Sequence, residues 1–163
     1  MEQERLNVLL ARVIRMAKEV NIPVSSRIRP EVAVNRRAKN RFGCCKREGG
    51  EYRIEISAMM LTAAEEMVCR VLAHEVLHTC RGCADHGARW QSYAKKMNDA
   101  YGLGIVRADS FDGLGVADDR QMRWWVVCTS CGQRMGRMKR SPLVDHPERY
   151  RCRCGGRLRV EEA

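Results

Sequence analysis

The chain has 163 residues, which is room for one modest domain and one small second unit and excludes a large barrel or a two-lobed enzyme. Thirty Lys and Arg residues against 20 Asp and Glu residues give a formal net charge of +10, which favours a polyanionic partner such as nucleic acid. No run of about 18 apolar residues occurs, so we expect no membrane span and no membrane partner.

The first predicted element is an amphipathic helix that ends before Pro23. Apolar residues recur at spacings of three and four between Leu6 and Val20. Glu2 and Glu4 lie where a signal peptide has basic residues, so we expect an intracellular, cytoplasmic protein, associated with the nucleoid if it is bacterial.

Residues 31–57 change to an alternation of apolar and polar side chains, which is the period of β-strands. The pair Gly49-Gly50 is typical of a hairpin turn between two of these strands. We predict two or three antiparallel strands in this region. One of them is rich in Arg36, Arg37, Lys39 and Arg41 and is expected to line a cleft, where an extended substrate can pair as an added strand.

Two further helices are predicted. Thr62 and Glu65 have the spacing of a capping box at the start of a nearly all-apolar helix from about residue 63 to residue 79. The other helix is predicted from residues that recur on one helix face from His86 onward, and Gly102 ends this helix. The sequence therefore predicts an α+β fold in which three main helices pack on a small antiparallel sheet.

The central predicted helix contains the motif His74-Glu75-Val76-Leu77-His78, or HExxH. Histidines four residues apart project from one helix face, so their rings can bind one Zn²⁺, and Glu75 can act as general base on a water that the zinc acidifies. Such polar groups are unfavourable inside an apolar helix unless they are satisfied. A hydrogen-bonded pair of core histidines is the alternative. His86 is the candidate third ligand, because a short loop can fold it back toward the motif.

The segment HEVLHTCRGCADHGARW, from His74 to Trp90, resembles the signature of the SprT-like metalloprotease family. In that signature HExxH is followed by seven residues and then by His-Gly-x-x-aromatic. Residues 35–57 resemble the strand region before the family's catalytic helix, and residues 150–158 resemble the zinc ribbon that closes many bacterial members. The resemblance covers most of the chain up to Leu158.

The resemblance implies a zincin-like protease core in which His74, His78 and His86 bind the catalytic zinc and Glu75 is the catalytic base. The best-understood members of the family cut proteins crosslinked to DNA and are stimulated by DNA. We therefore expect a zinc-dependent endopeptidase that acts on proteins at or crosslinked to DNA. Its protease domain would span residues 1–104, a linker residues 105–121, and a zinc ribbon residues 122–160.

The ribbon is predicted from two pairs of cysteines, each followed by glycine. Such knuckles are typical of a structural zinc site, because the glycine lets backbone N–H groups turn toward the sulfurs. The four expected ligands are Cys128, Cys131, Cys152 and Cys154. The second pair is CxC rather than CxxC, which leaves His146 as a substitute ligand and two reduced, metal-free pairs as the alternative. The further pair Cys80 and Cys83 can bind a metal, form a disulfide or remain free thiols. We thus expect two zinc ions per chain, one catalytic and one structural.

Charge is unevenly distributed along the chain. Residues 24–57 hold nine basic and four acidic residues, residues 122–163 hold ten and four, and residues 62–100, which contain HExxH, hold five of each. Seven ribbon residues are expected to contact DNA phosphates without reading sequence, with solvated surface charge as the alternative. They are Arg134, Arg137, Lys139, Arg140, Arg151, Arg153 and Arg157. Trp124 and Trp125 can add base stacking on single strands, although at least one of them is expected to pack inside the ribbon.

Two other functions compete with the protease hypothesis. One is a nucleic-acid-binding zinc-ribbon protein whose zincin core is a scaffold without proteolytic activity. The other is a nuclease or other hydrolase on a three-histidine zinc site. Glu75 favours the protease, because neither a scaffold nor the usual three-histidine endoribonuclease needs a base between two ligands.

Overall fold

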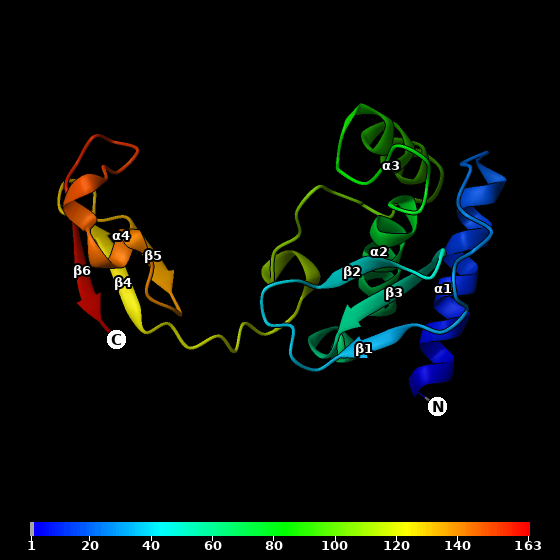
Figure 1. Ribbon diagram of the computed structural model, residues 1–163, viewed down its shortest axis with the longest axis horizontal. Coiled ribbons are helices and arrows are strands. Elements are labelled where there is room, and N and C mark those ends of the chain that lie inside the picture. The colour runs from blue at the N-terminus through cyan, green and yellow to red at the C-terminus, as the bar shows by residue number, and fades with distance from the viewer. Residues whose placement is uncertain (1) are drawn as a thin grey trace. The chain divides into compact units, whose positions relative to one another are not determined.

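The computed structural model describes residues 2–163, and the fold is of the mixed α+β class. The chain divides into two compact units, residues 1–118 and residues 119–163 (Figure 1). Within the described range, no helix combines the length and the apolar character needed to cross a membrane.

The first unit combines helices with one small sheet. Its elements are, in chain order, α1 (Glu2–Glu19), β1 (Ala33–Asn35), β2 (Gly43–Glu48), β3 (Glu51–Ser57), the 3₁₀ helix η1 (Ala58–Thr62), α2 (Glu65–Leu77), α3 (Ala88–Tyr101) and the 3₁₀ helix η2 (Asp112–Leu114).

The sheet has the order β1-β3-β2, so β2 is an edge strand. The predicted hairpin is confirmed, because β2 and β3 pair antiparallel around Gly49 and Gly50, whose φ angles are 59° and 84°. The prediction of a purely antiparallel sheet is wrong for β1, which runs parallel to β3. The reason is that β3, with the fully buried Ile54 and Ile56, takes the central position between two strands that precede it in the chain.

Helix α2 lies at the centre of this unit, where it contacts α1, α3 and the strands β2 and β3. Leu72 and Val76 of α2 are fully buried, as are Leu10 and Val13 of α1. Each such aliphatic side chain contributes about 1.5–3 kcal/mol on burial. The helix that carries HExxH is therefore held in a rigid core.

The predicted capping box is wrong. Thr62 ends η1, and its hydroxyl donates to the Met59 carbonyl, while the Glu65 carboxylate pairs with Arg12 at 3.3 Å. Helix α2 begins at Glu65, and its N-cap residue Ala64 offers no side-chain hydrogen bond. The side chains of Thr62 and Glu65 thus bond other partners and not each other's backbone. Thr62 belongs to η1, which ends shortly before α2 begins.

The arginine-rich stretch at residues 36–41 was predicted as a strand and is instead the loop between β1 and β2. The side chain of Asn35 accepts hydrogen bonds from the N–H groups of Arg37 and Ala38, which turns the chain immediately after β1. The strand that borders the cleft described below is β2.

The second unit is a three-stranded antiparallel sheet of order β5-β4-β6 with short helices. Its elements are β4 (Trp124–Cys128), β5 (Arg134–Arg137), α4 (Pro142–Asp145), the 3₁₀ helix η3 (Pro147–Arg149) and β6 (Leu158–Glu162). Its core contains Val126, Val144 and Leu158 together with two of the cysteines. A core this small gives limited stability, so a bound metal would supply much of the folding free energy.

The division into units differs from the predicted linker at residues 105–121. Ile105, Leu114 and Val116 are buried in the core of the first unit. Residues 105–118 therefore belong to the first unit, because their apolar side chains pack in its core.

Candidate metal centre

Three histidines from two segments converge in the first unit. His74 lies on α2, His78 is the C-cap residue of that helix, and His86 lies in the loop before α3. The Nε2 atoms are 2.8 Å apart for His74 and His86, 3.2 Å for His78 and His86, and 3.3 Å for His74 and His78. His86 thus folds back as expected, although it precedes α3, which begins at Ala88, and does not open the helix.

Backbone carbonyls orient two of the three rings. The Nδ1–H of His74 donates to the Val106 carbonyl at 2.9 Å, and the Nδ1–H of His78 donates to the Cys83 carbonyl at 2.7 Å. Because a carbonyl can only accept, both rings carry their proton on Nδ1 and direct an Nε2 lone pair at the common centre. The Asn98 side chain bonds both the N–H and the carbonyl of Ile105, which holds the segment that presents Val106.

These residues fit a zinc ion. Two nitrogen ligands of a tetrahedral zinc lie about 3.3 Å apart, because each Zn–N bond is about 2.0–2.1 Å long. The separations among the three histidines are close to this value. The lone pairs of His74 and His78 face each other without a proton between them, and a bound cation relieves that repulsion.

Burial keeps this cluster in the form that binds metals. Burial, followed by the neighbouring His78, lowers the pKa of His74 to about 4, and burial also lowers the pKa of His86. Trp90 of α3 is 1% exposed and packs against the three rings, with its centroid 4.7 Å from that of His74 and 4.6 Å from that of His86. For His74 and His86 these shifts favour the neutral imidazole, which is the form that binds a metal.

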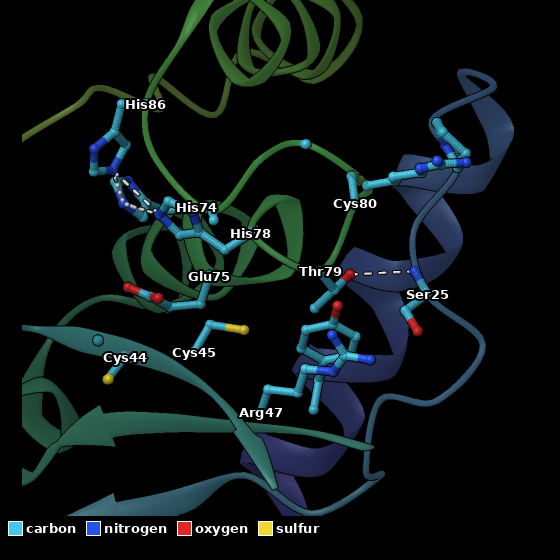
Figure 2. A pocket seen from close by; sticks show the side chains of 16 residues that line it. Ser25, Cys44, Cys45, Arg47, His74, Glu75, His78, Thr79, Cys80 and His86 are labelled. Atoms are coloured by element: carbon cyan, nitrogen blue, oxygen red, sulfur yellow. Dashed lines mark hydrogen bonds between the residues drawn. The ribbon is translucent and has the colours of Figure 1, made fainter. Parts of the chain in front are cut away.

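Glu75 lies between this cluster and the edge strand β2 (Figure 2). Its side chain is buried, and burial raises its pKa to about 8, although a hydrogen bond from the Cys45 N–H and the charge of Arg41 oppose that rise. The residue is held tightly, because a Cβ atom on Gly43 would lie 2.7 Å from Glu75 Oε1 and 2.8 Å from Val71 Cγ1. Gly43 thus allows β2 to approach the carboxylate, a role that the sequence reasoning missed.

The variant Gly43→Ala is expected to displace the Glu75 carboxylate and to lower the rate of any reaction that uses it by ~10- to 10²-fold, because small misplacements of catalytic groups have effects of this size. Zinc content is expected to stay unchanged, since the atoms nearest to the added methyl group belong to Glu75 and Val71 and not to a histidine. The measurement is substrate turnover beside elemental analysis. Gly50→Ala, which strains the hairpin at a φ of 84° away from Glu75, controls for lost stability. An equal loss in both variants would contradict the positioning role.

A cleft of about 930 Å³ extends from the three histidines along β2. Cys45, Thr79 and Cys80 line its middle, and Arg47 lies at the end away from His86 (Figure 2). A smaller cavity of about 200 Å³ lies on another side of Glu75 and His74, where Arg41 and Arg107 contribute to its lining. The candidate centre is thus open to a ligand on more than one side.

The four expected ribbon cysteines also converge. All four Sγ atoms lie within 4.8 Å of one another, and the closest pairs, Cys128 with Cys154 and Cys131 with Cys152, are 3.6 Å apart. Sulfur ligands of a tetrahedral zinc lie about 3.8 Å apart, given a Zn–S bond of about 2.3 Å. The four thiols therefore fit a zinc ion in spite of the short CxC pair.

Backbone groups favour the thiolate form of Cys128. The N–H groups of Cys131 and Ser130 point at its Sγ atom and lower the pKa of this thiol to about 6. Gly156 lies close to the same sulfur, where a Cβ atom would approach to 2.6 Å. Backbone N–H groups around a cysteine sulfur, with a glycine close to it, are typical of a zinc-binding turn.

The other cysteines and His146 lie outside both clusters. His146 is not a member of the four-thiol group, and its Nδ1 lies 3.5 Å from a Glu148 carboxylate oxygen. Cys80 and Cys83 are buried free thiols, and burial raises the pKa of Cys80 to about 12, which keeps that sulfur protonated. The structure therefore has no disulfide between these two cysteines.

The seven predicted DNA contacts all lie in the second unit. Six of them are exposed, and Arg137 on β5 is partly buried. Arg134 lies 4.8 Å from the centroid of the Trp125 ring, and Arg140 pairs with Asp145 at 2.6 Å. Trp124 packs on the ribbon core, as expected for one of the two tryptophans, and Trp125 is not part of that core cluster.

Comparison with known protein families places residues 13–110 in a family. A family model described as the SprT-like family matches residues 13–110, which include α2, the three histidines and Glu75. No curated protein matches the chain.

Proposed function

The chain belongs to the SprT-like family, and from this premise we propose that it is a zinc-dependent endopeptidase that cleaves proteins held at or crosslinked to DNA. The observation that carries the peptidase part is the placement of Glu75, a buried carboxylate directly beside three convergent histidine nitrogens. Burial of a carboxyl group is unfavourable for folding. A role for Glu75 in the reaction accounts for this placement, so it favours the protease over an inactive scaffold.

In the proposed reaction, His74, His78 and His86 hold the zinc and Glu75 handles protons. Zinc bound there supplies a Lewis acid that polarises the scissile carbonyl and lowers the pKa of a water. Glu75 accepts a proton from the attacking water and delivers it to the leaving amine. The Cys45 N–H and the close approach of Gly43 keep the carboxylate oriented for both transfers.

The oxyanion that forms during the attack needs a donor. Two tyrosines of α3, Tyr93 and Tyr101, are candidates for this role. The Tyr101 hydroxyl lies 2.8 Å from a Glu19 carboxylate oxygen and donates to the Met16 carbonyl at 3.1 Å, so it is engaged with α1. Neither tyrosine lines the cavities at Glu75.

The DNA part of the proposal rests on the charge of the second unit. Its net charge over residues 122–163 is +6, from ten basic and four acidic residues. The seven cations named above would contact phosphates, and Trp125, with Arg134 against its ring, offers an aromatic surface for a base. Such contacts would hold the chain on DNA without sequence preference.

The experiment is cleavage of a protein substrate by the zinc-loaded chain with no DNA, with single-stranded DNA and with double-stranded DNA. The proposal expects one form of DNA to raise the rate for a substrate bound to the same DNA. Cleavage that no DNA alters would contradict the DNA part and leave the peptidase part standing.

Removal of residues 119–163 is expected to abolish most of the DNA affinity, with zinc still bound at the three histidines. If all seven cations contact phosphates, affinity of the full chain should fall on the order of 10³-fold between about 50 and about 200 mM salt. The measurement is a binding titration across salt concentrations for both chains. Equal affinity of the two chains would show that the ribbon charge is only solvated surface.

A further inference from the structure

Four arginines from separate parts of the sequence line the two cavities around Glu75 and His74. Arg47 and Arg81 line the larger cleft, and Arg41 and Arg107 line the smaller cavity. Of the four, only Arg41 was expected at a cleft from the sequence, because the arginines come from β2, the loops at its start and after α2, and the segment after α3.

The charge of these arginines is largely uncompensated. Within residues 2–163, no ion pair is formed by Arg47, Arg81 or Arg107, and the Arg47 guanidinium lies 6.0 Å from the centroid of the Tyr52 ring. The carboxylates that line the cavities are Glu75 and Asp109, and Asp109 is paired with the partly buried Arg70.

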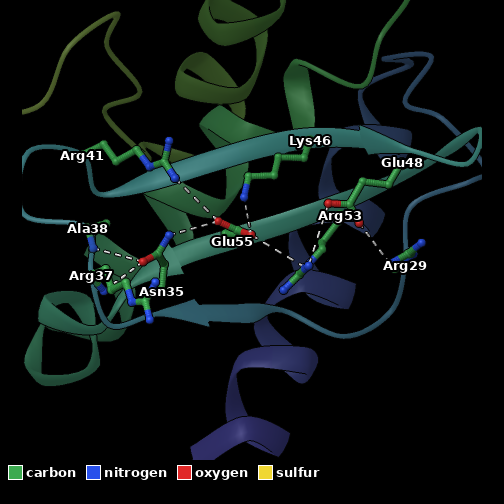
Figure 3. Close-up of polar contacts among 9 residues, drawn as sticks. All are labelled: Arg29, Asn35, Arg37, Ala38, Arg41, Lys46, Glu48, Arg53 and Glu55. Atoms are coloured by element: carbon green, nitrogen blue, oxygen red, sulfur yellow. Dashed lines mark hydrogen bonds and ion pairs between the residues drawn. The ribbon is translucent and has the colours of Figure 1, made fainter.

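Arg41 is also only weakly neutralised (Figure 3). Its guanidinium lies 3.8 Å from Glu55, which also bonds Lys46 at 2.8 Å and pairs with Arg53 at 3.8 Å. Burial alone would raise the pKa of Glu55, but hydrogen bonds from Lys46 and Asn35 outweigh it and hold the pKa below its usual value. One carboxylate is therefore shared by three cations, and positive charge remains at the cavity.

We propose that the cleft selects substrate segments that carry carboxylate side chains on both sides of the bond that is cut. This inference rests on the proposed peptidase function and adds the substrate class. Gly43, Cys45 and Arg47 alternate on the face of β2 that lines the cleft. At about 3.4 Å per residue, Arg47 lies roughly 14 Å along the strand from Gly43, which contacts Glu75, while Arg41 lies in the other direction. An extended peptide along β2 thus meets cations at both ends.

A peptide fits this surface better than a nucleic acid does. The outer edge of β2 offers alternating backbone donors and acceptors that an extended peptide can pair with, whereas the phosphates of a nucleic-acid backbone can only accept. The preference also suits a target on DNA. Basic segments of such a target lie against the phosphates, and its acidic segments are repelled from them and left accessible.

The test uses a set of peptides in which one glutamate is placed at successive positions around the scissile bond. A matched set carries glutamine at the same positions. Cleavage by the zinc-loaded chain and binding to the zinc-loaded Glu75→Gln chain are measured in parallel. We expect glutamate at favoured positions on each side of the scissile bond to raise kcat/KM and affinity about tenfold over glutamine. The double variant Arg47→Gln, Arg81→Gln should remove the preference on one side only, and the double variant Arg41→Gln, Arg107→Gln should remove it on the other.

Matched controls lose the same charge elsewhere. Lys95→Gln with Lys96→Gln removes two exposed cations of α3, which matches the charge lost in each double variant, and should keep the preference. Equal use of glutamate and glutamine peptides, or a preference that survives in the arginine variants, would overturn the proposal. So would a single-stranded oligonucleotide that displaces the peptide and depends on the same arginines.

The two proposals fail differently. Cleavage of all peptides without regard to charge would leave the peptidase standing and refute the selection. Arginine-dependent binding of the glutamate peptides to the Glu75→Gln chain, with no cleavage by the parent chain, would support the selection and refute the peptidase.

Discussion

Replacement of Glu75 by glutamine is expected to lower the rate of peptide cleavage by at least ~10²-fold, the lower range for loss of a general base. Glutamine has nearly the same shape and can occupy the space beside Gly43, but it cannot accept the proton of the attacking water. The three histidine nitrogens are untouched, so zinc should stay bound.

The measurement pairs initial rates with the zinc content of the same preparations. Glu66→Gln makes the same change of side chain at an exposed position in the first turn of the same helix, and it should leave both values unchanged. His86→Ala should lower zinc content and rate together, because it removes one of the three nitrogens. A Glu75→Gln chain as fast as the parent would refute the proposed chemistry.

The purified chain is expected to carry two zinc ions, and Cys152→Ser is expected to lower that number to one and to unfold residues 119–163. Cys152 is one of four convergent thiols, and the apolar core beside it is small. A structural zinc supplies much of the folding free energy in units of this size. The core of residues 1–118 is separate and should remain folded.

Elemental analysis and amide NMR spectra of the two chains measure this. Cys69→Ser, a buried free thiol in the first unit, serves as the control and should keep both ions. A zinc content near zero after expression with ample metal would contradict both sites. A content of three would implicate Cys80 and Cys83 in a further site.

The sequence predicts the parts of the fold that depend on local periodicity. The apolar repeat from Leu6 onward predicts α1, and Gly49-Gly50 predicts the β2–β3 hairpin. It does not predict the parallel pairing of β1, because strand order depends on which strand is buried most, and that is decided by packing on α2. The start of α2 was also predicted wrongly. Thr62 and Glu65 have the spacing of a capping box, but in the fold their side chains bond Met59 and Arg12.

At the candidate site, the four-residue spacing in HExxH is enough to place His74 and His78 together. The residues that support them carry no signal of their own. The carbonyls of Val106 and Cys83 act through backbone atoms that any residue has, and Gly43 acts through the absence of a side chain. These contributions become visible only when the segments are brought together in space.

The central claim is that zinc held by His74, His78 and His86 makes this chain a peptidase. Its most direct test is cleavage of an unfolded protein by the full chain after chelation and after stepwise return of zinc, with bound zinc measured at each step. The account predicts no cleavage by the metal-depleted chain and full recovery as the histidine site fills. Cleavage that persists in the depleted chain, or stays absent when both sites are full, would contradict it.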